Sequence, residues 1–267
     1  MSKLKKLRTI LNSMGSALIA YSGGADSSFL LHIASNTLPK EKILAVTANS
    51  ATYPKEELLL SRLMAKSFGV KHLIINSQEL KNSRFILNPS NRCYYCKKEL
   101  FGKLKPLAKK YGLQYVIDAS NFSDKDDFRP GDKAKKELGI RSPLQEARIT
   151  KGEIRSFSKR LGLKTWDKPS LACLASRIPY GTKITPVILR KVHRAENYLK
   201  NALHLSQVRV RHYNGLCRIE VIKADIPKII KKRNQVVDNF KKMGYNYIVL
   251  DLEGFRTGSM NLALLRR

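Results

Sequence analysis

Acidic residues are scarce in this sequence: its 267 residues include 21 Asp and Glu against 51 Lys and Arg, a formal net charge of +30. This scarcity excludes an acidic surface that would collect cations, and it favours polyanionic partners such as RNA, DNA or phosphorylated small molecules. The lysines are spread along the chain without a block of five or six like charges. A lysine-rich composition on solvated helix faces therefore explains the charge equally well.

Long apolar runs are also missing. No stretch of about 18 apolar residues occurs, so we expect no membrane span. The basic, mildly apolar residues 1–15 lack a long hydrophobic segment and a small-residue cleavage site, which predicts a helix and not a signal peptide. We expect a cytoplasmic protein. Low-complexity segments are absent and 43% of residues are hydrophobic, which predicts an ordered core.

Cysteine is limited to four residues: Cys93, Cys96, Cys173 and Cys217. In a cytoplasmic chain, the Cys-x-x-Cys spacing of the first two points to metal or redox chemistry more than to disulfides. Cys217 sits within an alternating strand pattern, which is typical of a small core hydrophobe.

Apolar strand patterns alternate with helical ones in the first part of the chain. We expect strands at 16–22, 43–49, 72–76 and 114–120, and helices at 3–13, 26–35, 54–69, 97–112 and 150–162, with Pro106 kinking or starting its helix. This order predicts an α/β fold with a parallel sheet covered by helices on both faces. Ligands of such folds bind at the carboxyl ends of the strands. The polar segment 121–149 is typical of an active-site segment or lid.

The pattern changes after residue 181. A helix at 186–204, strands at 207–213 and 217–222 turning at Asn214-Gly215, a helix at 225–244 and a strand at 247–253 are expected. We therefore predict two domains: 1–181, which contains the parallel sheet, and 182–267, a small α+β domain for substrate binding or oligomerisation.

The strongest motif is the segment Tyr-Ser-Gly-Gly-Ala-Asp-Ser-Ser at 21–28, between the first strand and the next helix. Gly23 and Gly24 let the backbone wrap an anion, and free N–H groups at the helix start attract phosphate. No lysine follows, so this is not the loop that holds a transferred γ-phosphate. A turn that only caps a helix is the alternative. Besides the backbone N–H groups, the hydroxyls of Ser22, Ser27 and Ser28 are candidate ligands for the phosphate. The carboxylate of Asp26 is a candidate that would bind the phosphate through Mg²⁺.

This segment resembles the PP-loop of the ATP-pyrophosphatase superfamily, whose members split ATP into pyrophosphate and an AMP adduct. We expect the backbone of Thr47 and Ala48, at the end of the second strand, near the adenine. Asp124, Asp127 and Arg129 are candidates to contact ATP or the activated carboxylate. A solvated acidic loop is an equally good interpretation of that last group.

The cysteines Cys93, Cys96 and Cys173 supply three thiolates. Three cysteines can hold a [4Fe–4S] cluster and leave one iron open for sulfide. Zinc, with His193 or a carboxylate as fourth ligand, and a redox dithiol are the alternatives. Lys168 and Arg177 give Cys173 a cationic setting, which favours a nucleophilic thiolate over an inert buried thiol.

Seven segments resemble the LarE family of ATP-dependent sulfur transferases, which build the nickel-pincer nucleotide cofactor. They are YSGGADSSFL (21–30), NRCYYCK (91–97), SNFSDKDDFRPG (120–131), GIRSPL (139–144), KPSLACLASRIPYGTKIT (168–185), VRVRHY (208–213) and DLEGFRTGSMN (251–261). They extend from the first strand almost to the end of the chain.

The resemblance implies that ATP adenylylates a carboxylate of pyridinium-3,5-biscarboxylic acid mononucleotide and that sulfur then displaces AMP. Members with only the cysteine at the position of Cys173 sacrifice it, whereas members with the additional pair use a [4Fe–4S] cluster with an extra sulfide. The chain has the pair, so we expect the cluster type, with catalytic roles for Cys93, Cys96 and Cys173. The resemblance also implies a homo-oligomer and a sulfide donor.

Arg209 and Arg211 alternate along one strand and therefore face the same side. They fit a clamp for the nucleotide phosphate of the substrate, although a solvated strand face is the other interpretation. Ser176 and Arg256 are further candidates for that phosphate site. The resemblance also implies a metal-binding carboxylate cluster, for which Glu196, Glu220 and Asp225 are the nearest candidates.

Three other functions fit parts of the sequence. A tRNA thiolase would use the same adenylation chemistry, and the net charge of +30 favours it. No RNA-binding module or zinc-ribbon cysteine pairs accompany that charge. An amidotransferase synthetase would leave the three cysteines unexplained. A nucleotide sensor would bind ATP without releasing pyrophosphate.

Overall fold

The computed structural model describes residues 2–126, 128–169 and 172–261. The chain forms two compact units. The first contains residues 1–82 and 91–171, and the second contains residues 83–90 and 172–267. The main segment of the second unit thus starts ten residues before the boundary expected after residue 181, and a short excursion of the chain joins it. In the described part of the chain, no helix has the length and apolar character needed to cross a bilayer.

The first unit is built on a parallel sheet with the order β3-β2-β1-β4. Its strands are β1 (Ala17–Ala20), β2 (Ile43–Asn49), β3 (Lys71–Asn76) and β4 (Tyr115–Ile117). The sequence predicted this parallel α/β sheet, and the structure confirms it. β4 is shorter than the expected strand at 114–120, because its last pairing with β1 joins Ile19 to Ile117.

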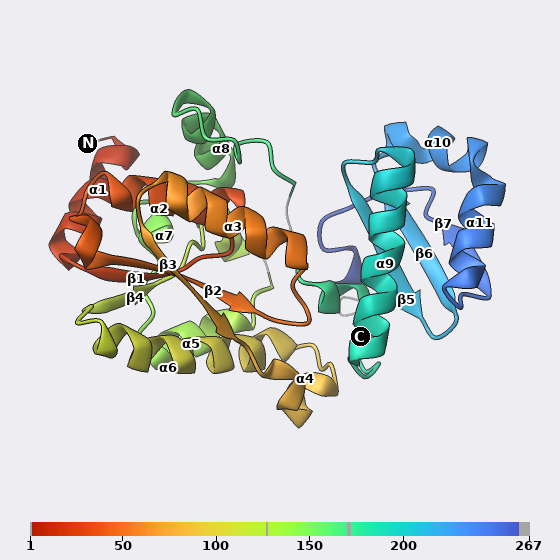
Figure 1. Cartoon of the computed structure of the whole chain (residues 1–267), viewed down its shortest axis with the longest axis horizontal. Coiled ribbons are helices and arrows are strands. Elements are labelled where there is room, and N and C mark those ends of the chain that lie inside the picture. Colours follow the sequence, from red (N-terminus) through yellow and green to blue (C-terminus); the bar gives the residue numbers. More distant parts are fainter. Residues whose placement is uncertain (1, 127, 170–171, 262–267) are drawn as a thin grey trace. The chain divides into compact units, whose positions relative to one another are not determined.

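Helices cover both faces of this sheet (Figure 1). Alternate strand residues feed two cores: Ile19 and Ala45 join the core under α1 and α2, and Leu18 and Leu44 join the core over α5. The helices of this unit are α1 (Lys3–Met14), α2 (Ala25–Ser35), α3 (Lys55–Ser67), α5 (Arg92–Lys110), α6 (Gly131–Leu138), α7 (Pro143–Glu146) and α8 (Lys151–Arg160).

α5 is longer than the helix expected at 97–112, because it begins at Arg92 and so includes the cysteine pair. The helix continues through Pro106, which does not start it.

The second unit has a sheet with the order β5-β6-β7. β5 (Val208–Tyr213) and β6 (Leu216–Val221) form the predicted antiparallel hairpin, and β7 (Tyr247–Leu250) pairs with β6 in parallel. Helix α9 (Pro186–Leu203) starts at Thr185, whose hydroxyl accepts from the Ile188 N–H, and packs against this sheet.

The single helix predicted at 225–244 was wrong. The chain instead forms α10 (Ile226–Lys231) and α11 (Arg233–Lys242), which separate at Lys232. The backbone of Lys232 leaves the helical region, with φ of −105° and ψ of 19°, and this change of direction ends α10. The remaining short elements are α4 (Ser83–Ile86) and the 3₁₀ turns η1 (Lys40–Lys42), η2 (Glu79–Lys81), η3 (Phe122–Asp126), η4 (Leu174–Arg177), η5 (Lys223–Asp225) and η6 (Ser259–Asn261).

Candidate active site

A pocket of about 170 Å³ lies at the carboxyl ends of β1 and β2 in the first unit. Its walls bring together four residues predicted from sequence: Ser22, Thr47, Ala48 and Cys96. These come from the glycine turn, from β2 and from α5, so the pocket joins the phosphate-loop motif to one cysteine of the pair. It lies where a parallel sheet of this type binds ligands.

The glycine turn has the backbone needed to surround an anion. Gly23 has φ of 65°, in the left-handed region, and a Cβ there would lie 2.9 Å from the Cβ of Ser61. Gly24 is the N-cap of α2, and because it has no side chain it cannot accept a hydrogen bond from the first N–H groups of the helix. The first N–H groups of a helix have no carbonyl partner within it, and they carry the positive end of the helix dipole. A phosphate group at this end of α2 would supply the missing acceptors.

The hydroxyls around the turn differ in their accessibility. Ser22 is exposed, and its Oγ lies 3.1 Å from the Oγ of Ser27. Ser27 also donates to the Gly24 carbonyl at 3.2 Å. Ser28 is fully buried, with its Oγ 3.2 Å from the hydroxyl of Tyr21. Ser22 is therefore the hydroxyl best placed for a ligand, and Ser28 braces the loop from inside.

Thr47 fixes the turn from the neighbouring strand. Its hydroxyl donates to the Tyr21 carbonyl at 2.7 Å and lies 2.8 Å from Nε2 of His72. The Tyr21 N–H donates to the Val46 carbonyl at 2.9 Å. The side chain of Thr47 is thus occupied within the fold, and contact of its backbone with a nucleotide stays a prediction.

Asp26 belongs to a small hydrogen-bonded group of oxygen-bearing side chains. Its carboxylate accepts from Nδ2 of Asn121 at 3.1 Å, and the Asn121 N–H donates to Asp124 at 2.9 Å. Burial raises the pKa of Asp26; the Asn121 hydrogen bond opposes this, and the Asp124 charge adds to it. Arg129 donates to the other Asp124 oxygen at 2.6 Å. Asp127 lies outside the described residues.

Asn121 was not predicted as a site residue. It is 1% exposed, and its Oδ1 has no hydrogen-bond partner within the described chain. A buried amide oxygen without a partner costs free energy unless a ligand or water satisfies it. Amide and carboxylate oxygens such as those of Asn121, Asp26 and Asp124 are the donor type that Mg²⁺ prefers.

A buried carboxylate in the wall of the pocket, that of Glu79, was also missed. Glu79 is 2% exposed and accepts hydrogen bonds from the hydroxyls of Ser50, Thr52 and Ser77. Glu79 follows β3 in a polar segment without a recognisable motif, so nothing in the sequence marked it as a site residue.

Cys93 and Cys96 lie in the first turns of α5, at a spacing that places them on one helix face. Cys93 is exposed and Cys96 is half-buried. Cys173 is exposed and precedes η4 in the second unit. Cys217 is fully buried, and burial raises the pKa of its thiol to about 12, which agrees with the predicted role in the core.

The two cations expected beside Cys173 have other partners. Arg177 binds the carbonyls of Ala172 and Cys173 through Nη1, at 2.6 and 3.0 Å, and its other nitrogens bind Glu196. Lys168 lies in the first unit, where its Nζ is 2.6 Å from the Glu57 carboxylate. Arg177 thus shapes the backbone at Cys173.

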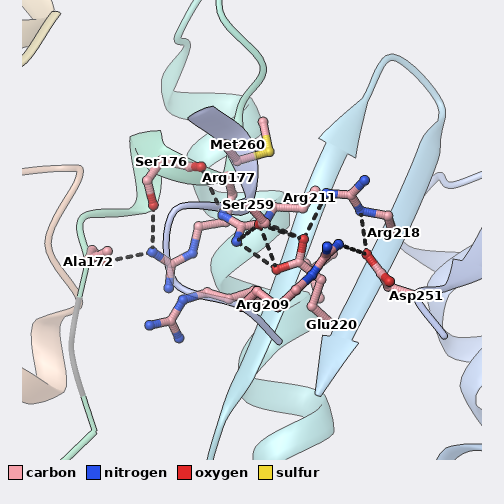
Figure 2. Close-up of polar contacts among 12 residues, drawn as sticks. Ala172, Ser176, Arg177, Arg209, Arg211, Arg218, Glu220, Asp251, Ser259 and Met260 are labelled. Carbon is pink, nitrogen blue, oxygen red and sulfur yellow. Dashed lines mark hydrogen bonds and ion pairs between the residues drawn. The ribbon is translucent and has the colours of Figure 1, made fainter. Parts of the chain in front are cut away.

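Arginine and acidic side chains form a buried network in the second unit (Figure 2). Arg211 binds both carboxylate oxygens of Glu220, at 3.0 and 2.6 Å, and also the Ser176 carbonyl at 3.0 Å and the Ser259 hydroxyl at 3.0 Å. Arg218, opposite Arg211 in the β5–β6 register, reaches the same carboxylate at 2.8 Å. The structure therefore brings Arg211 and the Ser176 backbone together, and both are candidates for the phosphate site. Ser259 was missed.

Arg209 is 4% exposed, and its guanidinium stacks over the Phe255 ring, 5.2 Å from its centroid. Burial and the neighbouring charge of Arg177 lower its pKa to about 10, with Glu196 opposing them. The guanidinium therefore stays charged at neutral pH. A solvated strand face, the alternative interpretation of Arg209 and Arg211, was wrong, because both side chains are buried.

The three carboxylates considered as metal ligands are each engaged by a cation. Glu196 pairs with Arg177, Glu220 pairs with Arg211, and Asp225 lies 2.7 Å from Nζ of Lys228. Among the described residues of the second unit, no three acidic, imidazole or thiol side chains are close enough to hold a metal ion. A metal role for these three remains a prediction that requires the ion pairs to open.

Two other predicted residues lie in the same unit. His193 has its Nε2 3.1 Å from Nδ2 of Asn197, one turn further along α9. Arg256 lies 2.7 Å from the Glu253 carboxylate and 3.7 Å from that of Asp251.

Comparison with known proteins gives full-length relatives. No protein-family model matches the sequence. An uncharacterized protein of Synechocystis is 43% identical over 99% of both chains. A pyridinium-3,5-bisthiocarboxylic acid mononucleotide synthase of Lactiplantibacillus plantarum is 34% identical over 99% of this chain and 96% of its own length. An uncharacterized protein of Methanocaldococcus jannaschii is 30% identical over 95% of this chain and 98% of its own.

Proposed function

We propose that this chain uses ATP to convert the carboxylates of pyridinium-3,5-biscarboxylic acid mononucleotide to thiocarboxylates. The chain belongs to the LarE family and is an enzyme. The observation that carries the proposal is the 34% identity, over 99% of the chain, to a protein named for the bisthiocarboxylic acid product. The glycine turn and the pocket beside it support the proposal independently, because they offer a phosphate site next to a cysteine.

The first step is adenylylation. A substrate carboxylate oxygen attacks the α-phosphorus of ATP, the bond from that phosphorus to the bridging oxygen of the β-phosphate breaks, and pyrophosphate leaves. The N–H groups of Gly23 and Gly24 and the start of α2 would hold the pyrophosphate part, since backbone N–H groups at a helix start attract phosphate. Thr47 and Ala48 would contact the adenine through their backbone.

Magnesium fits the group formed by Asp26, Asn121 and Asp124. The donor atoms are all oxygens. Oδ1 of Asn121 accepts no hydrogen bond from the described residues and is therefore available to a metal ion. When bound, Mg²⁺ would neutralise charge on the phosphates. Asp26 is the ligand that carries its carboxylate into the phosphate loop itself.

The second step delivers sulfur. A sulfur nucleophile attacks the carbonyl carbon of the acyl adenylate, AMP leaves with the electrons of the broken C–O bond, and a thiocarboxylate forms. Cys93, Cys96 and Cys173 supply the thiolate donor set that suits a [4Fe–4S] cluster, which when bound offers an open iron for sulfide. In the alternative, Cys173 gives up its own sulfur and becomes dehydroalanine, with no cluster.

The substrate's own phosphate would bind at Arg209 and Arg211. Ser176, whose carbonyl accepts from Arg211, and Arg256, which shares Asp251 with Arg218, would join that site. Arg211 already binds Glu220, so the additional positive charge for a phosphate comes mainly from Arg209. Buried arginines recognise phosphate through paired N–H groups.

The experiment is an anaerobic assay of the purified chain with ATP, Mg²⁺, sulfide and the biscarboxylic acid mononucleotide. We expect equal amounts of AMP and pyrophosphate, and a product in which sulfur replaces oxygen by mass spectrometry. ADP formation would contradict the proposal. Pyrophosphate release that requires tRNA and not the mononucleotide would instead favour a tRNA thiolase, the function that the net charge of +30 suggests. Binding of tRNA would then depend strongly on salt.

A further inference from the structure

Two consecutive carbonyl groups of the glycine turn are held by side chains from distant segments. The Tyr53 hydroxyl donates to the Ser22 carbonyl. The Lys168 ammonium donates to the Gly23 carbonyl at 3.0 Å. All these residues belong to the first unit, and neither Tyr53 nor Lys168 lies within the loop motif itself.

The orientation of these carbonyls decides where the loop's N–H groups point. In a trans peptide unit the C=O and the following N–H are in one plane and point in opposite directions. The Ser22 carbonyl therefore fixes the Gly23 N–H, and the Gly23 carbonyl fixes the Gly24 N–H. With both carbonyls tied to side chains, each N–H group points away from the side chain that holds the preceding carbonyl, as in a backbone nest for an anion. The Gly24 N–H meets the exposed hydroxyl of Ser22 at 3.4 Å, at the long end of the hydrogen-bond range, so it is still available to a phosphate oxygen.

The two donors are themselves well supported. The Lys168 and Glu57 side chains are 16% and 13% exposed, and they lie 2.6 Å apart, so the ammonium is shielded and directed. Burial raises the pKa of Tyr53, with the charge of Glu57 and the Tyr21 phenol adding to the effect. The phenol therefore keeps its proton and remains a donor to Ser22.

We propose that Tyr53 and Lys168 are positioning residues that hold the N–H groups of Gly23 and Gly24 directed at the pyrophosphate part of ATP. This inference rests on the proposed function and extends it to two residues that act on the phosphate through the loop backbone. Glu57 supports them by orienting the Lys168 ammonium.

The test measures the affinity of the full chain for inorganic pyrophosphate and, separately, for adenosine by calorimetry. Tyr53→Phe is decisive, because it removes a hydroxyl and no charge. We expect it to weaken pyrophosphate binding roughly fivefold, the equivalent of one hydrogen bond, and to leave adenosine binding within error. Lys168→Met should weaken pyrophosphate binding further, and Lys168→Arg should restore part of it.

Matched controls separate positioning from general effects. Tyr111→Phe and Lys5→Met make the same changes on exposed side chains and should bind both ligands like the wild type. Wild-type pyrophosphate affinity in Tyr53→Phe and Lys168→Met, or an equal loss of adenosine affinity, would overturn the inference. So would a wild-type chain that binds no pyrophosphate. A chain that binds pyrophosphate but does not release it from ATP in turnover contradicts the proposed function instead.

Discussion

Arg177 and Glu196 form a two-point ion pair inside the second unit, with Nε 2.8 Å from Oε1 and Nη2 3.0 Å from Oε2. The two side chains are 2% and 3% exposed. Glu196 also accepts from the Val210 N–H at 3.0 Å, and Arg177 also binds the Cys173 carbonyl. One buried pair therefore connects helix α9, strand β5 and the backbone of the cysteine that the proposal makes reactive.

Removal of Arg177 should destabilise the second unit strongly. Arg177→Met leaves the Glu196 carboxylate buried without its cation, which typically costs about 3–5 kcal/mol. The double variant with Glu196→Leu should recover much of that loss, since it removes the carboxylate that Arg177→Met leaves without its cation. Urea unfolding monitored by circular dichroism measures both. Equal stability of the single variant and the wild type would show that the pair is dispensable.

Acid should remove the contribution of Glu196. Burial alone would raise the pKa of this carboxyl, but the Arg177 charge and hydrogen bonds outweigh it and hold the pKa below its ordinary value of 4.5. A carboxyl with a depressed folded-state pKa stabilises the protein fully above its unfolded-state pKa, and this stabilisation is lost as the pH falls through the folded-state value. Below pH 4.5 the wild type should therefore lose stability more steeply than Glu196→Gln. Parallel slopes in urea titrations at each pH would contradict this.

Asp26→Asn should stabilise the ligand-free protein and impair nucleotide binding. Burial raises the pKa of Asp26, so the ionised form is disfavoured in the fold, and this penalty grows as the pH rises above its ordinary value of 3.8. An amide removes that penalty but is a weaker Mg²⁺ ligand. We expect Mg²⁺ affinity in the presence of ATP to fall on the order of 100-fold, a loss typical of altered metal sites.

Thermal unfolding and Mg²⁺ titration of ATP binding check the two halves of that prediction. Glu41→Gln, which removes an exposed carboxylate in η1, is the matched control and should change neither quantity. A destabilised Asp26→Asn variant with normal Mg²⁺ affinity would mean that Asp26 has a structural role.

Iron binding should depend on three of the four cysteines. Anaerobic reconstitution should give about four irons per chain with matching sulfide, and Cys93→Ala, Cys96→Ala or Cys173→Ala should lose most of it. Cys217→Ala should retain iron, because that thiol is buried and its pKa is about 12. Zinc without labile sulfide would contradict the cluster, and loss of hydrogen sulfide from Cys173 by mass spectrometry would support the sacrificial route.

Arg209 should carry most of the charge available to a phosphate in the second unit. Phosphate should raise the thermal unfolding temperature of the wild type, because Arg209 is buried beside Arg177 and Arg211 and an anion reduces their mutual repulsion. Arg209→Gln should abolish that increase, whereas Arg190→Gln on the exposed side of α9 should preserve it. An unchanged response in Arg209→Gln would exclude this phosphate site.

The sequence predicted those parts of the site that are local in the chain. The turn at Gly23 and Gly24 follows from a strand, two glycines and a helix start within eight residues. The Asn214-Gly215 hairpin follows from its turn residues. Both were found as predicted, because backbone geometry at such positions depends on the residues present there.

Contacts between distant segments could not be predicted from one sequence. Lys168 reaches Gly23 across 145 positions, and Asn121 reaches Asp26 across 95. The pairing of Glu220 with arginines depends on the β5–β6 register, which puts Arg218 opposite Arg211. A strand pattern gives the faces of one strand but not its partner's residues, so the arginine partners of Glu220, a candidate metal ligand, could not be predicted.

The excursion at 83–90 has a consequence for any attempt to produce the second unit by itself. Asn88 is fully buried, and its amide donates to the carbonyls of Ile178, Pro179 and Thr182. A fragment starting at Ala172 would contain those three carbonyl acceptors without the amide that donates to them. It would also lack the packing that residues 83–90 provide in this unit. A self-sufficient fragment would have to be spliced, with the octapeptide supplied in trans or fused ahead of residue 172.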